Sequence, residues 1–223
     1  MKFIEYPDAD MMMIDLANQI AGDLNAALLH EDRVCLAVPG GTTPGPLFDG
    51  LCAADLPWER VDVMLTDERW VPEDSPRSNT RLIKERLLVN RAAAARHLPL
   101  YAPAEKPEDV IAELEAMIAP ELPIGVLLLG MGTDMHTASL FPGADRLEDA
   151  LDSNAPTLMP IRSDKTQEPR VTLTAPILDG ALRKHIIITG AEKRAAFEAA
   201  QQSSPKDAPI SAVLTGADVH WAP

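Results

Sequence analysis

An acid and a histidine lie close together on a glycine-rich segment of the chain. The segment LLLGMGTDMH, residues 127–136, begins as a buried strand and then places Asp134 and His136 two positions apart. A histidine changes charge near neutral pH, and a neighbouring carboxylate can fix its tautomer and stabilise its protonated form. The two residues could form an acid–base pair. Asp134 could instead contact the substrate, because residues two apart need not touch.

Ser139 lies three residues beyond His136 and is a possible nucleophile. Its surroundings, TASLF, do not match the G-x-S-x-G elbow that presents a nucleophilic serine. We therefore expect Ser139 to start a helix or to pack. A lone loop histidine is usually structural, but the flanking glycines and the position after a strand favour a functional His136.

A second glycine-rich segment, VPGGTTP at residues 38–44, also follows a strand-like run. Gly40 and Gly41 would let backbone N–H groups approach a ligand, and Thr42 adds a hydroxyl donor. An ordinary tight turn is an equally good interpretation. The segment matches neither the Walker loop nor the dinucleotide-binding fingerprint.

Three charged residues come directly after another strand-like run. In TDER, residues 66–69, the planar guanidinium of Arg69 could hold an anionic group. Asp67 and Glu68 could orient that arginine or meet sugar hydroxyls. The alternative is a solvated turn with an internal ion pair.

Two more cations are candidates for an anion site. Lys193 lies in the first turn of a predicted helix, where the helix dipole disfavours a cation unless an anion also binds there. Arg194 is the alternative donor at that place. Arg170 precedes VTLT and could join the site from the side.

Apolar strands alternate with helices along the whole chain. This order predicts a parallel sheet covered on both faces, and with no long linker it predicts one domain over residues 1–223. Ligands bind at the carboxyl ends of such strands, where each unusual segment begins. The main expected strands are 33–38, 61–66, 124–130 and 184–190, and the main expected helices are 8–29, 79–90, 107–119 and 191–202.

The composition restricts the possible partners. The formal net charge is −14, so the overall field repels nucleic acid and anionic membrane surfaces. No apolar run approaches the ~20 residues that span a bilayer, and the N-terminus lacks a signal-peptide profile. Two cysteines give no disulfide framework, so we expect a reduced, cytoplasmic protein.

Metal ligation is not expected, because no H-x-x-x-H, C-x-x-C or EF-hand pattern occurs. Among the other histidines, His30, His97 and His185 have no partner nearby in the sequence, so we expect them to be structural. The sequence assigns no role to His220.

Several motifs together resemble one enzyme family. The segments PGGTTP, TDERWVP, SNTRLIKERLL and GMGTDMHTASLFPG, in that order, are similar to the 6-phosphogluconolactonase family, and RVTLTAPIL and ITGAEKR match its later segments. The wider superfamily includes glucosamine-6-phosphate deaminase/isomerase. The resemblance implies a Rossmann-like, doubly wound α/β fold. It also implies hydrolysis of 6-phosphoglucono-δ-lactone in the pentose phosphate pathway, with no metal or organic cofactor.

The resemblance also implies roles for individual residues. His136 matches the general base, with Asp134 the acid beside it, and Arg69 matches the arginine after the second strand. The positions matched to binding of the phosphorylated sugar lactone are Gly40, Gly41, Thr42, Asp67, Arg170 and Lys193.

One position departs from the family's pattern. The family usually has Asp-Gly-His where this chain has Asp134, Met135 and His136. If that glycine needed a positive φ, Met135 would be strained.

Two alternatives remain at this point. One is an amino-sugar phosphate deaminase, which is disfavoured because HTASLFP has no carboxylate before Asp145. The other is a non-catalytic sugar-phosphate sensor. The sequence leaves open whether the protein is a monomer or a homodimer, and whether Arg69 or a backbone N–H stabilises the oxyanion.

Overall fold

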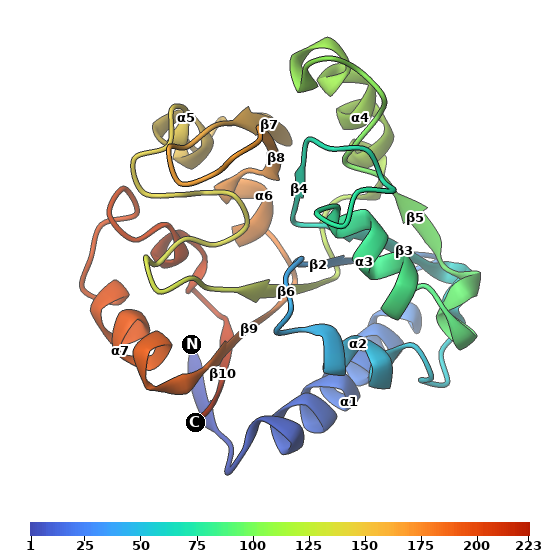
Figure 1. The fold of residues 1–223 in the computed structure, drawn as a ribbon. Coiled ribbons are helices and arrows are strands. Elements are labelled where there is room, and N and C mark those ends of the chain that lie inside the picture. The colour runs from blue at the N-terminus through green and yellow to red at the C-terminus, as the bar shows by residue number, and fades with distance from the viewer.

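The computed structural model describes residues 1–223 and contains a seven-stranded sheet in which every neighbouring pair of strands is parallel (Figure 1). This confirms the predicted parallel sheet. In spatial order its strands are β1 (Lys2–Glu5), β10 (Asp218–Ala222), β9 (Arg183–Thr189), β6 (Val126–Gly130), β2 (Val34–Val38), β3 (Val61–Leu65) and β5 (Arg96–Leu98).

The two central neighbours, β2 and β6, mark the point where the strand order reverses. From β2 the chain continues outward through β3 to β5, and from β6 it continues the other way through β9 to β10. Loops that follow β2 and β6 therefore meet over a crevice, which is where doubly wound sheets bind ligands. The predicted glycine-rich segments are these two loops.

A second, three-stranded antiparallel sheet was not predicted. It consists of β4 (Asp67–Arg69), β8 (Arg170–Leu173) and β7 (Leu158–Ile161), in that order. From the sequence, the segment DER comes directly after an apolar strand or forms a solvated turn; in the structure it is a strand of its own. Pairing in this sheet places Arg69 directly opposite Arg170, so it brings together two cations that are far apart in the sequence.

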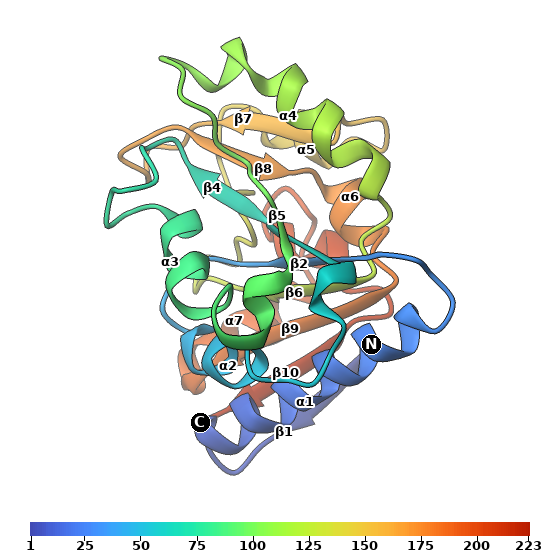
Figure 2. The same ribbon diagram turned by 90° about the vertical axis from the view of Figure 1, so that its right-hand side faces the viewer.

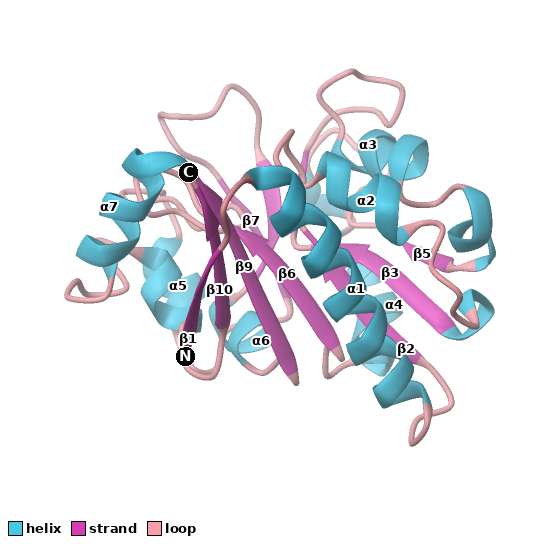
Figure 3. Cartoon of the chain, turned by 90° about the horizontal axis from the view of Figure 1, so that it is seen from below, coloured by secondary structure: helices cyan, strands magenta, loops and turns pink.

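Helices lie on both sides of the large sheet, which confirms the predicted fold class. Figure 3 shows α1 crossing one face, and Figures 1 and 2 show the small sheet with α4 and α5 on the opposite side. The helices are α1 (Ala9–Leu28), α2 (Gly45–Leu51), α3 (Asn79–Arg86), α4 (Ile111–Ile118), α5 (Leu147–Leu151), α6 (Ala175–Asp179) and α7 (Gly190–Ala200).

The helix and strand ends differ from the predictions in several places. Helix α3 ends at Arg86 rather than at residue 90. The predicted helix 107–119 is interrupted at Val110, whose φ of −131° is not helical, so a short 3-10 turn precedes α4. The segment LPLY, residues 98–101, predicts a short strand, which the structure places earlier, at Arg96–Leu98; β1 was not predicted.

One continuous apolar core connects these layers. It contains 56 buried residues, and β2 and β3 are buried along their whole length. Strands covered on both faces carry mostly apolar side chains, with Asp62 of β3 the exception here, which explains why these segments were easy to predict. None of the helices combines the length and the hydropathy that crossing a membrane would require.

His185, which we expect to be structural, has partners that lie far from it in the sequence. Its Nε2 lies 2.9 Å from Asp23 Oδ2, and its Nδ1 lies 3.1 Å from His220 Nε2. The other ring nitrogen of His220 lies 3.0 Å from the Tyr6 hydroxyl. Burial lowers the pKa of His220 to about 4, so this ring is neutral at pH 7. The network joins α1, β9 and β10 near the edge of the large sheet that β1 forms.

Candidate active site

A cavity of about 290 Å³ opens at the carboxyl edge of the large sheet, where the loops after β2 and β6 meet β4 and the first turn of α7. Every residue that the family resemblance implies for the site, except Asp134, lines its wall. Those lining residues are Gly40, Gly41, Thr42, Asp67, Arg69, His136, Arg170 and Lys193.

Asp134 lies behind the wall and contacts His136. Its Oδ1 is 2.5 Å from His136 Nδ1, and it also accepts from the backbone N–H of His136 at 3.3 Å. The question that the spacing left open is thereby answered, because the two side chains do pair. The ring of His136 also packs against Phe141, with 4.3 Å between the ring centroids.

The turn that makes this pairing possible is tight. Met135 has a φ of +65°, and its N–H donates to the carbonyl of Gly132 at 3.0 Å. The strain expected from the sequence is therefore present, since L-residues disfavour this region. Gly132 is in close contact with the pair: a Cβ added there would lie 2.2 Å from His136 Nδ1 and 2.6 Å from Asp134 Oδ1.

The charge of Asp134 decides which nitrogen of His136 is free. Partial burial would raise the pKa of Asp134, but hydrogen bonds from Lys165 and His136 outweigh it and lower the pKa to about 2. An ionised carboxylate only accepts, so Nδ1 carries the proton and a neutral ring has its lone pair on Nε2. His136 therefore presents a proton acceptor on a ring that lines the cavity.

Arg69 and Arg170 line the cavity side by side. Arg170 Nη1 lies 3.5 Å from Asp67 Oδ2, and Arg69 Nη1 donates to the carbonyl of Arg77 at 2.7 Å. The Nε atoms of Arg69 and Arg170 are buried and have no hydrogen-bond partner, and each lies 3.9 Å from Glu168. Both guanidinium groups thus keep unused donor capacity.

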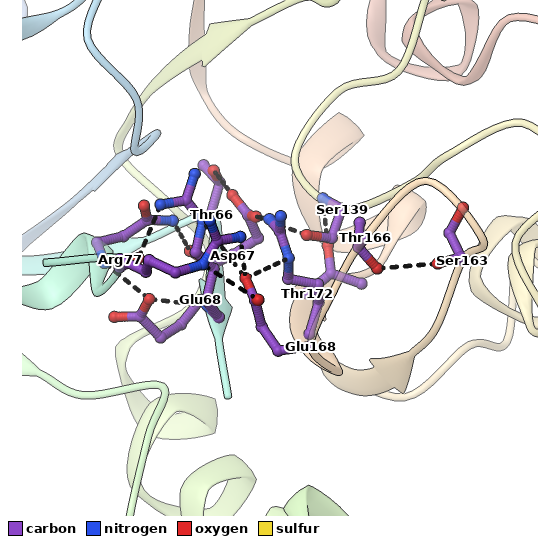
Figure 4. Close-up of polar contacts among 12 residues, drawn as sticks. Thr66, Asp67, Glu68, Arg77, Ser139, Ser163, Thr166, Glu168 and Thr172 are labelled. Carbon is purple, nitrogen blue, oxygen red and sulfur yellow. Dashed lines mark hydrogen bonds and ion pairs between the residues drawn. The ribbon is translucent and has the colours of Figure 1, made fainter. Parts of the chain in front are cut away.

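Ser139 forms a hydrogen bond to Asp67, the acid beside the two arginines. It lies outside any helix, so the expectation of a helix start is wrong, whereas the alternative of a packed residue is confirmed. Its hydroxyl donates to Asp67 Oδ2 at 2.6 Å, and Figure 4 shows the two side chains facing each other. Asp67 therefore accepts from Ser139 and Arg170 together, and it orients the arginine.

Glu68 has a structural role. It is fully buried, does not line the cavity, and accepts from the backbone N–H groups of Arg69, Asn79 and Thr80 at 2.7–2.8 Å. Its carboxylate satisfies free donors at the start of α3, so it fixes β4 against that helix. Glu68 is therefore neither part of a solvated turn nor in a position to contact sugar hydroxyls in the cavity.

The glycine-rich loop after β2 is held close to α3. A Cβ on Gly40 would lie 2.1 Å from Asn79 Oδ1, and Gly41 has a φ of +87°. The N–H groups of Gly40, Gly41 and Thr42 form no hydrogen bond within the protein. They are free donors at the cavity wall. From the sequence, Asn79 is one of two residues, with Ser78, placed to cap a helix; the structure also places it on the cavity wall.

Lys193 and Arg194 face different surroundings. Lys193 lines the cavity and forms no ion pair or hydrogen bond, and partial burial lowers its pKa. Arg194 is paired with Glu5 and Glu198 and does not line the cavity. Of the two predicted donors, the structure places only Lys193 at the site.

Two charged residues near the site were missed, and no motif in the sequence indicates them. Both lie on the loop between β7 and β8: Lys165 contacts Asp134, and Glu168 contacts Arg77 (Figure 4 shows the second pair).

No group of three or more His, Cys, Asp or Glu side chains is arranged to hold a metal ion.

Comparison with known proteins gives a consistent result. A family model described as "Glucosamine-6-phosphate isomerases/6-phosphogluconolactonase" matches residues 7–221. A 6-phosphogluconolactonase of Mesorhizobium japonicum is 42% identical, with 98% of this chain and 94% of that protein covered. One from Rhizobium meliloti is 40% identical, with 93% of each chain covered.

Solved structures agree with this comparison. The crystal structure of a 6-phosphogluconolactonase from Shewanella baltica is 31% identical and superimposes with a TM-score of 0.95, covering 100% of this chain and 97% of that one. A monomeric glucosamine-6-phosphate deaminase shares the fold, with a TM-score of 0.79 at 16% identity. The chain therefore belongs to the family of glucosamine-6-phosphate isomerases and 6-phosphogluconolactonases.

Proposed function

We propose that this chain hydrolyses 6-phospho-D-glucono-1,5-lactone to 6-phosphogluconate, in the oxidative branch of the pentose phosphate pathway, with His136 as general base. Relatives with this activity in their names match nearly the whole chain. The observation that carries the mechanism is the pairing of an ionised Asp134 with His136, on one wall of a cavity that also holds Lys193 without a counter-ion.

The phosphate is placed by cations and free amides. Lys193 and Arg170 supply positive charge, and the unbonded N–H groups of Gly40 and Gly41 supply donors that an anion can accept. Binding at this end puts the lactone carbonyl beside His136. Asp67 would keep Arg170 in the orientation that the phosphate requires.

The chemical step is addition of water to the carbonyl carbon. Nε2 of His136 takes a proton from the attacking water, and Asp134 stabilises the imidazolium that forms. The carbonyl oxygen becomes an oxyanion, which Arg69 or a backbone N–H stabilises. When the intermediate collapses, the bond to the ring oxygen breaks and that oxygen takes the proton back from His136. The balance needs only substrate, water and these side chains.

The wider organisation belongs to the same proposal. We treat residues 1–223 as one domain, because a single core includes strands from both sheets. The partner is a small phosphorylated lactone rather than nucleic acid or a membrane, and the protein would act in the cytoplasm as a monomer or homodimer.

The structure gives the rival functions little support. A deaminase-like acid after His136 would have to be Asp145, whose Oδ1 accepts from the backbone N–H of Arg162 at 2.8 Å and which does not line the cavity. A non-catalytic sensor was suggested only by Met135. That residue adopts the positive φ, and His136 still lines the cavity.

The test is a pH-stat or coupled assay with fresh lactone, corrected for its spontaneous opening. We expect acid release well above the uncatalysed rate, and no ammonia from glucosamine 6-phosphate. Ammonia release would support the deaminase instead. Thermal stabilisation by the sugar phosphate without turnover would support the sensor.

Replacing Gly132 with alanine should lower kcat by roughly tenfold or more, because the added Cβ cannot fit beside the Asp134–His136 pair and displacement by about 1 Å is costly in catalysis. The measurement is kcat in the same assay. Gly22→Ala is the matched control, since a Cβ on Gly22 meets nothing within 4 Å. Equal rates in the two variants would show that the pair tolerates movement.

A further inference from the structure

The carboxylate behind the proposed base has a second partner. Asp134 Oδ1 pairs with His136, and Asp134 Oδ2 accepts from Lys165 Nζ at 2.8 Å. The three side chains form a continuous row of ammonium, carboxylate and imidazole. Because each oxygen of Asp134 has its own partner, the carboxylate cannot turn without losing one of them.

Lys165 comes from a different part of the chain, 31 residues beyond Asp134, and the turn that carries it is well built. The backbone N–H of Lys165 donates to Ser163 Oγ at 3.2 Å. Thr166 donates to the carbonyl of Ser163 through its N–H and its hydroxyl, and Figure 4 shows Thr166 beside Ser163. Arg162 and Pro169 fix the two ends of the loop through backbone hydrogen bonds to Asp145 and Trp70. The ammonium is thus presented to Asp134 by an ordered segment.

We propose that Lys165 is a positioning residue for the reaction: it orients Asp134 and partly cancels its charge, and it thereby sets the pH below which His136 stops acting as a base. The proposal rests on the proposed function. A bare carboxylate next to an imidazole favours the protonated ring, which cannot accept a proton from water. A cation on the far oxygen weakens that effect, so the neutral ring persists to lower pH.

The other charges around His136 come from the remaining walls of the site and stay the same when Lys165 is changed. They are Asp67 and Arg69 on β4, Arg170 on β8 and Lys193 on α7. None of these forms an ion pair or hydrogen bond with Asp134. Lys165 is therefore the cation whose removal leaves the charge of Asp134 less compensated.

A purely structural role predicts a different result. The Lys165 side chain is 48% exposed, and such exposed ion pairs contribute little to stability. A direct contact with the phosphate also predicts a different result, because it would act on KM. Neither role would move the pH dependence of the reaction.

The test compares the pH dependence of kcat/KM for the wild-type protein, Lys165→Met and Lys165→Arg. We expect the acid-side midpoint to rise by about 0.5–1 pH unit in Lys165→Met, and to return toward the wild-type value in Lys165→Arg. KM on the plateau should change less than about twofold. Lys206→Met is the matched control, because Lys206 is also an exposed lysine paired with an acid, Glu148, away from the cavity.

Three results would overturn the proposal. They are an unchanged midpoint in Lys165→Met, a raised KM with an unchanged midpoint, and an equal shift in Lys206→Met. If Lys165→Met does not fold, Lys165→Gln makes the same charge change. The protonation midpoint of the His136 ring, followed by NMR, should shift in the same direction. That readout needs no substrate, so it tests Lys165 even if the wild-type protein fails to hydrolyse the lactone.

Discussion

Replacing His136 with asparagine is expected to lower kcat by about 10²–10⁴-fold while changing KM little. Asparagine has a similar polar reach but cannot take a proton from water at neutral pH. The phosphate would still bind, because Lys193, Arg170 and the free amides lie on other walls of the cavity. The measurement is kcat and KM from initial rates with fresh lactone, with the spontaneous reaction subtracted at each concentration.

The size of this effect follows from the substrate. A δ-lactone is an activated ester that opens in water without help, so a base needs to contribute only a modest factor. His30→Asn is the matched control, because His30 is exposed and lies outside the cavity. Wild-type turnover in His136→Asn would remove His136 from the mechanism. A raised KM with unchanged kcat would instead make it a binding residue.

The glycine-rich loops and the central strands could be predicted because their signals are local. An apolar run that ends in glycines and polar residues indicates a buried strand with a loop at its carboxyl end, and all such loops open at one edge of a parallel sheet. This rule alone was enough to place Gly40, Asp67, His136 and Lys193 near each other, and the cavity contains all four.

The features that could not be predicted depend on contacts between distant parts of the chain. Lys165 reaches Asp134 across 31 residues, and His185 reaches Asp23 across 162. An isolated charged residue in a sequence is more often solvated than paired, so neither partner stands out. The strand β4 was missed for a related reason. Its central Glu68 is buried only because backbone N–H groups of α3 surround it.

The departure at Met135 shows how a local rule can be broken without loss of the site. Glycine is the residue that adopts a positive φ at little cost, and a non-glycine residue pays about 1–2 kcal/mol there. Met135 adopts this conformation, and its carbonyl accepts from the N–H of Ile210 at 3.1 Å. Its side chain packs against the apolar core. Tertiary contacts therefore stabilise the turn that the Asp134–His136 pair requires.

Replacing Lys193 with alanine is expected to raise KM by roughly 10–150-fold with a smaller effect on kcat. A hydrogen bond to a charged group contributes about 1.5–3 kcal/mol, and each 1.4 kcal/mol is a factor of ten in binding. Lys193 is half-buried near the positive end of α7, and no carboxylate balances its charge. Such a cation is unfavourable in the free protein and becomes favourable when a phosphate arrives.

Arg194→Ala separates this role from a general loss of positive charge on α7. The two residues are neighbours, but Arg194 is paired with Glu5 and Glu198 outside the cavity, so its removal should leave KM unchanged. Lys193→Ala should also weaken protection of the protein by inorganic phosphate in thermal unfolding, while the ligand-free protein unfolds at the same temperature or higher, because a desolvated cation has been removed. Unchanged KM and unchanged phosphate protection would place the phosphate elsewhere. The lactone would then have to lie in a different orientation relative to His136, since Lys193 is one of the two cations proposed to hold the phosphate.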